Sequence, residues 1–210
     1  MRSSTRLLLL TGILALCSGC ASLGSNVPFQ YQPALIASGK QIPKTVGFEM
    51  LVDARPEKDK KYTAHIHDIP GKITSKVIDD FNTSHLFSDV HYPVKETDDI
   101  MVGGTIKRFK WKFYDKLFAY IPYVGLALVV LGVPLSEAYG ITELQLEFKE
   151  RASGKILGTF SAESKVTSSY SIYNFKAGES GSELAESFRD VVRKLKEEIA
   201  LKLSGKPEPS

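Results

Sequence analysis

Cysteine is scarce in this sequence of 210 residues, and its absence from most of the chain limits the chemistry that is possible. The two cysteines, Cys17 and Cys20, lie close together near the N-terminus. The chain beyond them therefore has no disulfide framework and no thiolate metal site.

Patterns typical of catalysis and of nucleic-acid binding are also missing. The sequence contains no glycine-rich phosphate loop, nucleophile elbow or catalytic triad pattern. The 27 basic and 24 acidic residues nearly balance, so the net charge predicts no nucleic-acid partner. We therefore expect neither an enzyme nor a cofactor.

Histidine is the one metal-ligating residue type that clusters, because all four histidines fall within residues 65–91. His65 and His67 would share one face of a strand, which is half of a metal site, with Asp68 adjacent. No third ligand stands at a diagnostic spacing. A polar loop with exposed histidines is the simpler interpretation, and we predict no metal site.

The N-terminus has the composition of an export signal. Arg2 and Arg6 precede the apolar run Leu7–Leu16, and the small residues Ser18 and Gly19 follow. The order positive, apolar, small predicts a secretory signal peptide. The apolar run is shorter than the ~20 residues that a stable membrane span needs.

The run Leu16-Cys17-Ser18-Gly19-Cys20 resembles the lipobox of bacterial lipoproteins, with Cys17 where that class usually has leucine. The resemblance implies cleavage after residue 19 and acylation of Cys20, so that the lipid holds the protein on a membrane. In that class Ala21, which is not aspartate, implies sorting to the periplasmic face of the outer membrane. The alternative is an ordinary secretory signal with two incidental cysteines.

The rest of the chain divides into a tether, one domain and a tail. Residues 20–44 carry the lipidated cysteine and a Pro-, Ser- and Gly-containing stretch that predicts a flexible tether, with a reach of roughly 80 Å when extended. Residues 45–203 are expected to form a single domain, and residues 204–210 a polar tail.

Apolar periodicity within the domain predicts alternating strands and helices. A strand over 46–52 precedes a helix over 72–85, a short strand over 90–94 and a longer one over 100–114. Strands over 142–148 and 156–170 then form a hairpin, and a helix opens near Ser180 and Glu183, which have capping-box spacing. Because each element has one apolar face, we expect an α+β fold: a two-layer sheet with helices on one face and an apolar insertion between two strands. Asp53 and Arg55 are expected to pair across a turn.

The pattern over roughly residues 45–115 resembles small periplasmic lipoproteins of the YajG-like kind. It is also similar to periplasmic lipoproteins that activate cell-wall synthases or assist outer-membrane secretion. The resemblance implies a binding or assembly module that has no catalytic activity.

Residues 117–135 form a run of nineteen residues without a charge. Pro122 and Pro134 limit any helix between them to about eleven residues, or ~17 Å, which is too short to cross a hydrocarbon core of ~30 Å. The segment is therefore either a projection that contacts lipid or a partner, which we favour, or a buried loop or helix. The predicted contact residues are Trp111, Phe113, Tyr120, Tyr123, Leu126, Leu128, Val130 and Leu131.

The strand before this segment alternates aromatic and basic residues. Phe109, Trp111 and Phe113 share one face, and Arg108, Lys110 and Lys112 the other. Aromatic and basic residues beside an apolar run are typical of a membrane interface. Any half-buried strand shows the same alternation, and for the strand alone we favour a core face.

Two classes of function follow. The first is a membrane-anchored, non-catalytic lipoprotein that binds an envelope protein or lipid during assembly. The second is a periplasmic lipoprotein that binds a small ligand, a lipid or a metal. A projecting hairpin would favour the first class, and a concave pocket lined by 117–135 would favour the second.

Overall fold

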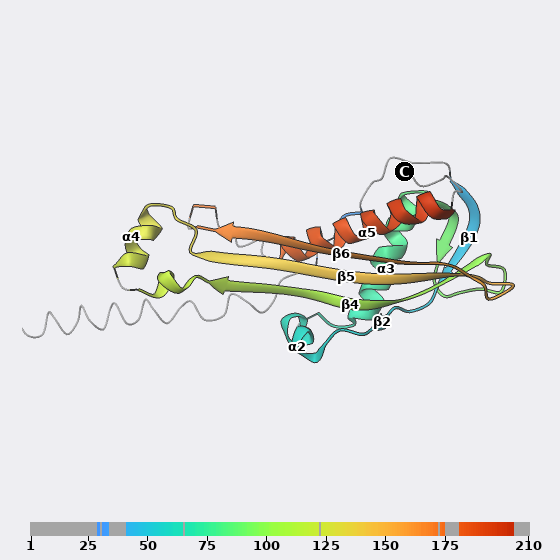
Figure 1. Ribbon diagram of the computed structural model, residues 1–210, viewed down its shortest axis with the longest axis horizontal. Helices are drawn as coiled ribbons and strands as arrows, with labels where there is room; N and C mark the ends of the chain where they lie inside the picture. The colour runs from blue at the N-terminus through green and yellow to red at the C-terminus, as the bar shows by residue number, and fades with distance from the viewer. Residues whose placement is uncertain are drawn as a thin grey trace, which may run out of the picture.

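The computed structural model describes residues 29, 31–33, 41–64, 66–121, 123–171, 173–174 and 181–203. Cys20, Ala21 and residues 204–210 lie outside these ranges. Cleavage after residue 19, acylation and the polar tail therefore stay predictions. Within the described ranges the chain has the predicted α+β fold, with one open, mixed sheet and helices packed on it (Figure 1).

Six strands form the sheet in the described chain. The order is β3–β1–β4–β5–β6, and the short β2 also pairs with β4. β1 is parallel to β3 and β4, whereas β4, β5 and β6 form an antiparallel meander. The bounds are β1 Ile42–Phe48, β2 Val52–Asp53, β3 Phe87–His91, β4 Ile100–Asp115, β5 Ser136–Glu150 and β6 Ile156–Tyr170.

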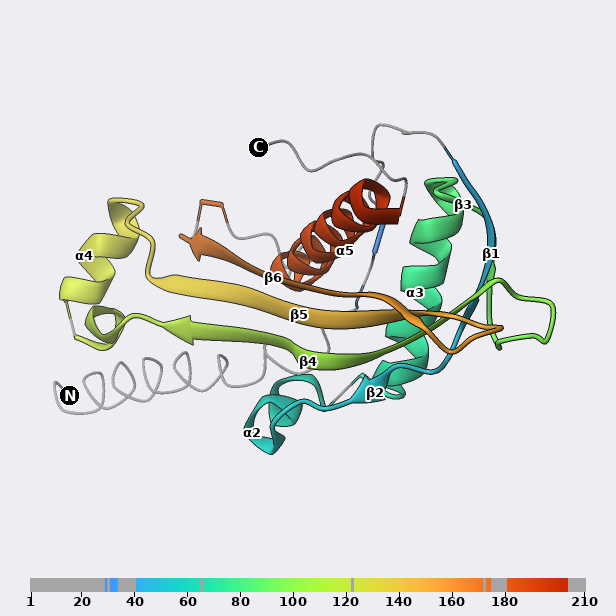
Figure 2. The ribbon, with the colours of Figure 1, turned by 45° about the vertical axis from the view of Figure 1, so that its right-hand side comes forward.

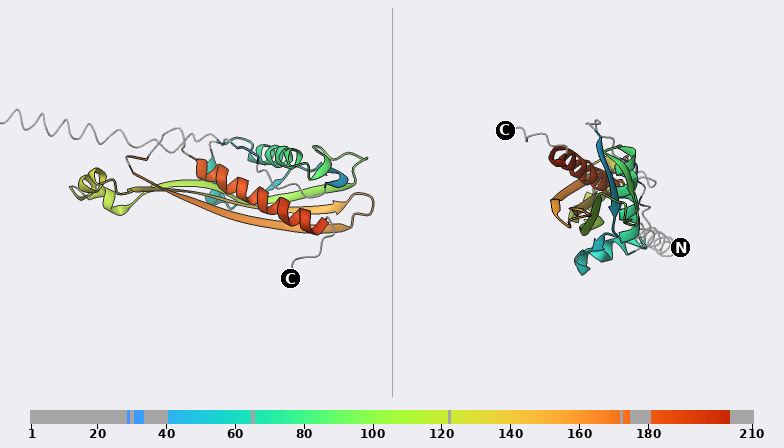
Figure 3. Two further views of the ribbon diagram at one scale, coloured as in Figure 1. Left: turned by 90° about the horizontal axis from the view of Figure 1, so that it is seen from above. Right: turned by 90° about the vertical axis from the view of Figure 1, so that its right-hand side faces the viewer.

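Two long helices lie side by side on the sheet (Figures 2 and 3). α3 spans Ile69–Thr83, and α5 spans Ser182–Leu203. α3 begins three residues before the expected position, because Asp68 caps it by accepting a hydrogen bond of 3.1 Å from the backbone N–H of Gly71. A buried ion pair between Lys196 of α5 and Asp80 of α3 joins the helices. This arrangement confirms the predicted two layers.

A short helical stretch follows β2 and precedes the loop that the sequence predicts around the histidines. It consists of α2, Glu57–Lys60, and the 3₁₀ turn η2, Lys61–Thr63. This stretch lies beside β4 beyond the end of β2 (Figure 2).

The core lies between the sheet and the two helices, and aromatic rings dominate it. Rings from strands and helices contact one another in the chain Phe81–Phe87–Phe148–Phe160, with centroid separations of 6.2, 6.0 and 5.4 Å. The fully buried phenylalanines are Phe48, Phe81, Phe109, Phe148, Phe160 and Phe188.

A bulge in β4 decides which side chains of this strand reach the core. Ile106 pairs with Leu144 but Arg108 pairs with Glu143, so Lys107 is an extra residue in the ladder. An extra residue reverses the alternation of the strand. Even-numbered positions such as Ile106 are buried before the bulge, and the odd-numbered Phe109 and Trp111 are buried after it.

Part of the predicted tether packs on the domain. The ring of Phe29 lies 5.2 Å from that of Phe109 and 5.5 Å from that of Phe188. The ring of Tyr31 lies 4.7 Å from Phe188. β1 also begins at Ile42, inside the stretch expected to be flexible. The free reach of the chain after Cys20 is thus much shorter than the predicted ~80 Å.

Candidate functional site at the tip of the long hairpin

Residues 117–135 form the tip of the hairpin that β4 and β5 make, at the end away from α3 (Figure 1). The tip contains the 3₁₀ turn η3, Leu117–Tyr120, and the helix α4, Val124–Val130. At its base the backbone N–H of Lys116 donates to the carbonyl of Leu135 at 2.7 Å, and that of Leu135 donates to Tyr170 of β6 at 3.0 Å. The segment therefore projects from the sheet as an ordered extension of the ladder, as the prolines and the lack of charge predicted.

Most large side chains of the tip are exposed. Leu117, Tyr123 and Leu131 are 84 %, 87 % and 76 % exposed. The predicted contact residues Tyr120, Tyr123, Leu126, Val130 and Leu131 all belong to this exposed set, while Leu128 is half-buried. Large exposed apolar groups gathered in one place typically mark a contact surface.

Two residues predicted for this surface lie elsewhere. Trp111 is only 5 % exposed, and its indole N–H donates to a carboxylate oxygen of Glu183 at 3.0 Å. Phe113 is half-buried and packs against the core, with its ring 6.2 Å from that of Trp111. The inclusion of Trp111 in the contact surface is therefore wrong, and the core interpretation of this strand face is correct for it.

Charged and hydroxyl groups gather at the base of the tip. We call this group the collar, and its members are Tyr114, Asp115, Lys116, Tyr120, Ser136 and Glu137. Asp115 accepts hydrogen bonds from Tyr120 at 3.0 Å and from Ser136 at 2.6 Å. Glu137 accepts from Tyr114 and lies 2.8 Å from the ammonium of Lys116. The hydrogen bonds from Lys116 and Tyr114 lower the pKa of Glu137, so this carboxylate stays ionised. The charges closest to the apolar tip are thus paired within the chain.

Tyrosine is concentrated at this end of the molecule. Six of the nine tyrosines belong to it: Tyr114, Tyr120, Tyr123, Tyr139, Tyr170 and Tyr173. On the sheet face away from the helices, the ammonium of Lys165 lies 5.2 Å from the ring centre of Tyr139, and that of Lys112 lies 5.9 Å from that of Tyr114. Tyrosine and lysine together are typical of the interface between a membrane and water.

A buried cluster connects the tip end of the hairpin to α5. Glu183, in the first turn of α5, accepts hydrogen bonds from Trp111 of β4 and Tyr170 of β6. Burial, the hydrogen bond to Glu183 and the charge of that carboxylate raise the pKa of Tyr170 to about 12. α5 can approach β5 closely here because Gly140 has no side chain. A Cβ at this position would lie only 2.4 Å from the backbone of Glu183. Glu183 therefore joins α5 to the strands, and its partner in the predicted capping box, Ser180, lies outside the described residues.

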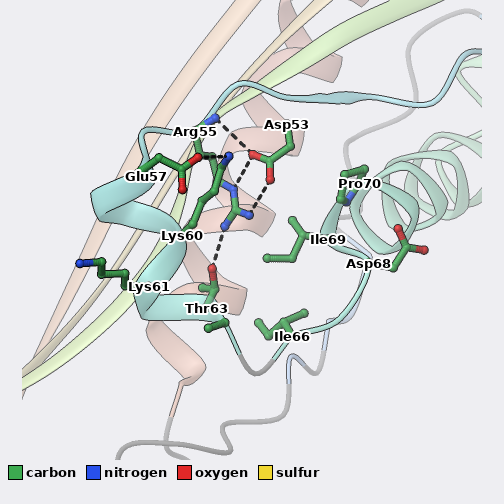
Figure 4. A pocket seen from close by; sticks show the side chains of 11 residues that line it. Asp53, Arg55, Glu57, Lys60, Lys61, Thr63, Ile66, Asp68, Ile69 and Pro70 are labelled. Carbon is green, nitrogen blue, oxygen red and sulfur yellow. Dashed lines mark hydrogen bonds and ion pairs between the residues drawn. The ribbon is translucent and has the colours of Figure 1, made fainter.

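A second candidate site is a surface hollow of about 460 Å³ beside α2 (Figure 4). The guanidinium of Arg55 donates to both carboxylate oxygens of Asp53 at 2.8 Å, to Thr63 at 2.7 Å and to the carbonyl of Phe109 at 3.2 Å. The hydrogen bond from Arg55 is the main reason that the pKa of Asp53 is lowered. The predicted pair is confirmed. Because these bonds go to acceptors on three elements, Arg55 holds β2, η2 and β4 together.

Of the predicted histidine pair, only His67 can be placed, and it does not lie on a strand. His67 falls in the bend between η2 and α3, and His65 lies outside the described residues. Among the residues that the structure describes, no group of three metal-ligating side chains comes together. The absence of a bound metal stays a prediction for direct metal analysis.

The geometry so far defines a small α+β domain with an apolar hairpin tip, and comparison with known proteins places its fold. No family model matches the chain, and no curated protein matches its sequence. Among solved structures, a DUF330 protein from Xanthomonas campestris is similar, with a TM-score of 0.50 and 10% identity over 81% of this chain and 89% of that one. This likeness is one of fold alone.

Two further structures have lower TM-scores. PelC from Paraburkholderia phytofirmans has a TM-score of 0.41 and 10% identity, and the match covers 85% of this chain and 95% of that one. A minor lipoprotein from Acinetobacter baumannii has a TM-score of 0.38 and 10% identity over 81% and 100% of the two chains. The described helices include none with the length and apolar character needed to cross a membrane.

Proposed function

We propose that this chain is a non-catalytic lipoprotein of the bacterial envelope. Lipid on Cys20 holds it on the periplasmic face of the outer membrane, and the apolar hairpin tip contacts lipid or another envelope component. The exposed tip carries the proposal, because nineteen uncharged residues project from a domain whose core is complete without them. The lipobox-like run before Cys20 supports the anchor.

The alternative class, a periplasmic binder of small ligands, has less support. A binder built around the apolar segment would need that segment to line a concave pocket. The segment projects instead, and the hollow of Figure 4 is lined by residues between Asp53 and Pro70.

The test combines two changes in the full-length chain. One is Cys20→Ser, and the other replaces 117–135 by a short Gly-Ser turn that joins Lys116 to Ser136. The turn is compatible with the fold because Asp115 and Ser136 are already paired across the ladder. Envelope fractionation and incorporation of labelled palmitate are measured for each single variant and for the double variant.

We expect Cys20→Ser to abolish palmitate incorporation. We also expect the double variant to be released from membranes more completely than Cys20→Ser alone, because the tip supplies a second contact. If Cys20→Ser is still processed to the mature size, labelled and retained, the proposed anchor is wrong. If tip replacement changes no binding in either background, the tip has no part in the function.

A further inference from the structure

The chain between the lipid and the domain is short, which restricts where the domain sits relative to its membrane. Phe29 is held against Phe109 and Phe188 by ring contacts of 5.2 and 5.5 Å. Nine residue steps separate Cys20 from Phe29, and they span at most roughly 30 Å. Phe29 is therefore never farther than this from the acylated cysteine, and its contact point on β4, Phe109, lies one pair of packed rings beyond it.

Both ends of the long meander lie within that reach. From Phe109 to Asp115, at the collar, β4 runs six residues, or roughly 20 Å. In the opposite direction, from Phe109 to Ile100, it runs nine residues, or roughly 30 Å. The membrane that holds Cys20 can thus meet either end.

The two ends differ in their charge. The end opposite the tip carries the β3–β4 loop with Glu96, Asp98 and Asp99 and the β5–β6 turn with Arg151 and Lys155. Ionised groups resist transfer out of water. The tip has no charge over nineteen residues and exposes most of its large apolar side chains. Only the tip end is suited to enter a bilayer.

The layers of the tip end match the layers of a membrane interface. The apolar surface of η3 and α4 comes first, and the collar follows, in which Asp115 and Glu137 are already bonded to neighbouring groups such as the tyrosines Tyr120 and Tyr114. α4, with seven residues, runs across the long axis of the hairpin (Figures 1 and 3), so it lies in the plane of the interface when the hairpin points into the membrane, as interfacial helices do. Lys112 and Lys165 lie behind the collar, at the level of the headgroups.

We infer that the tip inserts into the same bilayer leaflet that holds the lipid on Cys20, so that the lipoprotein is attached at two points with its hairpin pointing into the membrane. This inference rests on the proposed lipid anchor. It commits the tip to lipid, whereas the proposed function left lipid and protein open. A tip that meets only a protein, or a second membrane, is the opposing outcome.

Depth-dependent fluorescence quenching on the intact lipoprotein tests the inference. After processing and acylation no free thiol remains, so Leu126→Cys introduces the only reactive one. Thr159→Cys, an exposed position on β6 near the opposite end, is the matched control. Each variant carries an environment-sensitive fluorophore and is reconstituted in vesicles of phosphatidylethanolamine and phosphatidylglycerol, with nitroxide on the acyl chains.

We expect the probe at position 126 to be quenched severalfold and the probe at 159 to keep its emission. An unquenched probe at 126 on protein that floats with the vesicles overturns the inference while the lipid anchor stands. Protein that does not float at all contradicts the anchor itself, so the two failures are distinguishable.

A second arrangement of the quencher tests whether the leaflet is the same one. Nitroxide lipids are placed only in added vesicles that carry no protein. We expect no quenching at position 126 in this arrangement, because the tip and the anchor enter one bilayer. Quenching by the added vesicles would place the tip in a second membrane and overturn the inference.

Discussion

In the helix-covered half of the sheet, inward-facing side chains of β4 and β5 meet α3, α5 or Phe29, and the large rings are fully buried. At the tip the same hairpin carries equally apolar side chains that meet few neighbours, and Leu117, Tyr123 and Leu131 stay largely in solvent. The inward-facing side chains of the covered half and the side chains of the tip are both apolar, so the difference in their exposure comes from the second layer, which ends at the first turn of α5. Apolar residues stabilise the fold only where another layer covers them.

This comparison divides the apolar residues into those needed for folding and those free for contact. Burial of a large apolar side chain contributes about 1.5–3 kcal/mol. A change in the covered half should therefore lower the free energy of unfolding, and a change at the tip should act on binding.

The largest effect is expected for Phe188→Ala in α5. Phe188 is fully buried, and its ring contacts Phe29, Tyr31 and Phe109. Loss of the ring leaves a cavity and should lower the free energy of unfolding by about 3–5 kcal/mol. Leu201→Ala, at a partly exposed position of the same helix, is the control and should lose much less. Equal losses in urea unfolding of the two variants would contradict the assignment of the core.

The next effect concerns the boundary between the two regions. Glu183→Ala removes the acceptor of Trp111 and of Tyr170, which leaves two donors without this carboxylate. We expect a loss of about 1–3 kcal/mol. Trp111 is the only tryptophan, so its fluorescence reports the change directly. Glu186→Ala, on the exposed face of the same turn, is the control, and a similar loss there would mean that the cluster adds no stability.

Most of the covered half could be predicted from the sequence, because periodicity follows burial. The alternation in β5 and the apolar face of α5 at Leu184, Phe188, Val191, Leu195 and Ile199 both correspond to buried residues. The bulge at Lys107 appears in the sequence only as a change of alternation between Ile106 and Phe109, which does not by itself distinguish a bulge from the end of a strand. The contacts of Phe29 and Tyr31 depend on tertiary packing, and the two residues show no period of their own.

For the tip, the sequence predicts that the segment projects from the sheet, but it does not predict which side chains form the exposed surface. The charge-free run and its two prolines indicated a segment that leaves the sheet. Trp111 was assigned to the surface by its position in the chain, whereas the partner that buries it, Glu183, is 72 residues away. Long-range partners of this kind leave no local pattern. The collar pairs that join β4 to β5, such as Ser136 with Asp115, likewise depend on contacts across the ladder.

A smaller, pH-dependent effect is expected on the outer side of α5. Burial alone would raise the pKa of Asp190, but hydrogen bonds from Lys194, Arg193 and Ser164 outweigh it and lower the pKa from 3.8 to about 2. A lowered folded-state pKa stabilises the protein above the unfolded value, and this contribution is lost as the pH falls from about 4 to about 2.

Because Asp190 is partly exposed, we expect Asp190→Asn to cost only about 1–2 kcal/mol near pH 7. The gap between wild type and variant should close as the pH falls through this window. Asp79→Asn, an exposed carboxylate on α3, is the control for the removal of one charge. If the difference in the free energy of unfolding between wild type and Asp190→Asn stays constant down to about pH 2, the ion pairs of Asp190 do not stabilise the fold.

The smallest effect on stability, with the largest effect on binding, is expected at the tip. Tyr123→Asp together with Leu126→Asp places two charges on side chains that already lie in solvent, so the free energy of unfolding should change by less than about 0.5 kcal/mol. In a membrane each aspartate would cost up to about 3 kcal/mol at the bilayer centre and less near the surface. In the Cys20→Ser background, where no lipid masks the effect, vesicle sedimentation should therefore show at least tenfold weaker binding.

Thr159→Asp together with Ser161→Asp adds the same charge at the opposite end and should leave binding nearly unchanged, since those residues face away from the proposed membrane. A tip variant that melts far below wild type would instead make these residues part of the core, and one that binds vesicles as well as wild type would exclude the tip from the membrane contact.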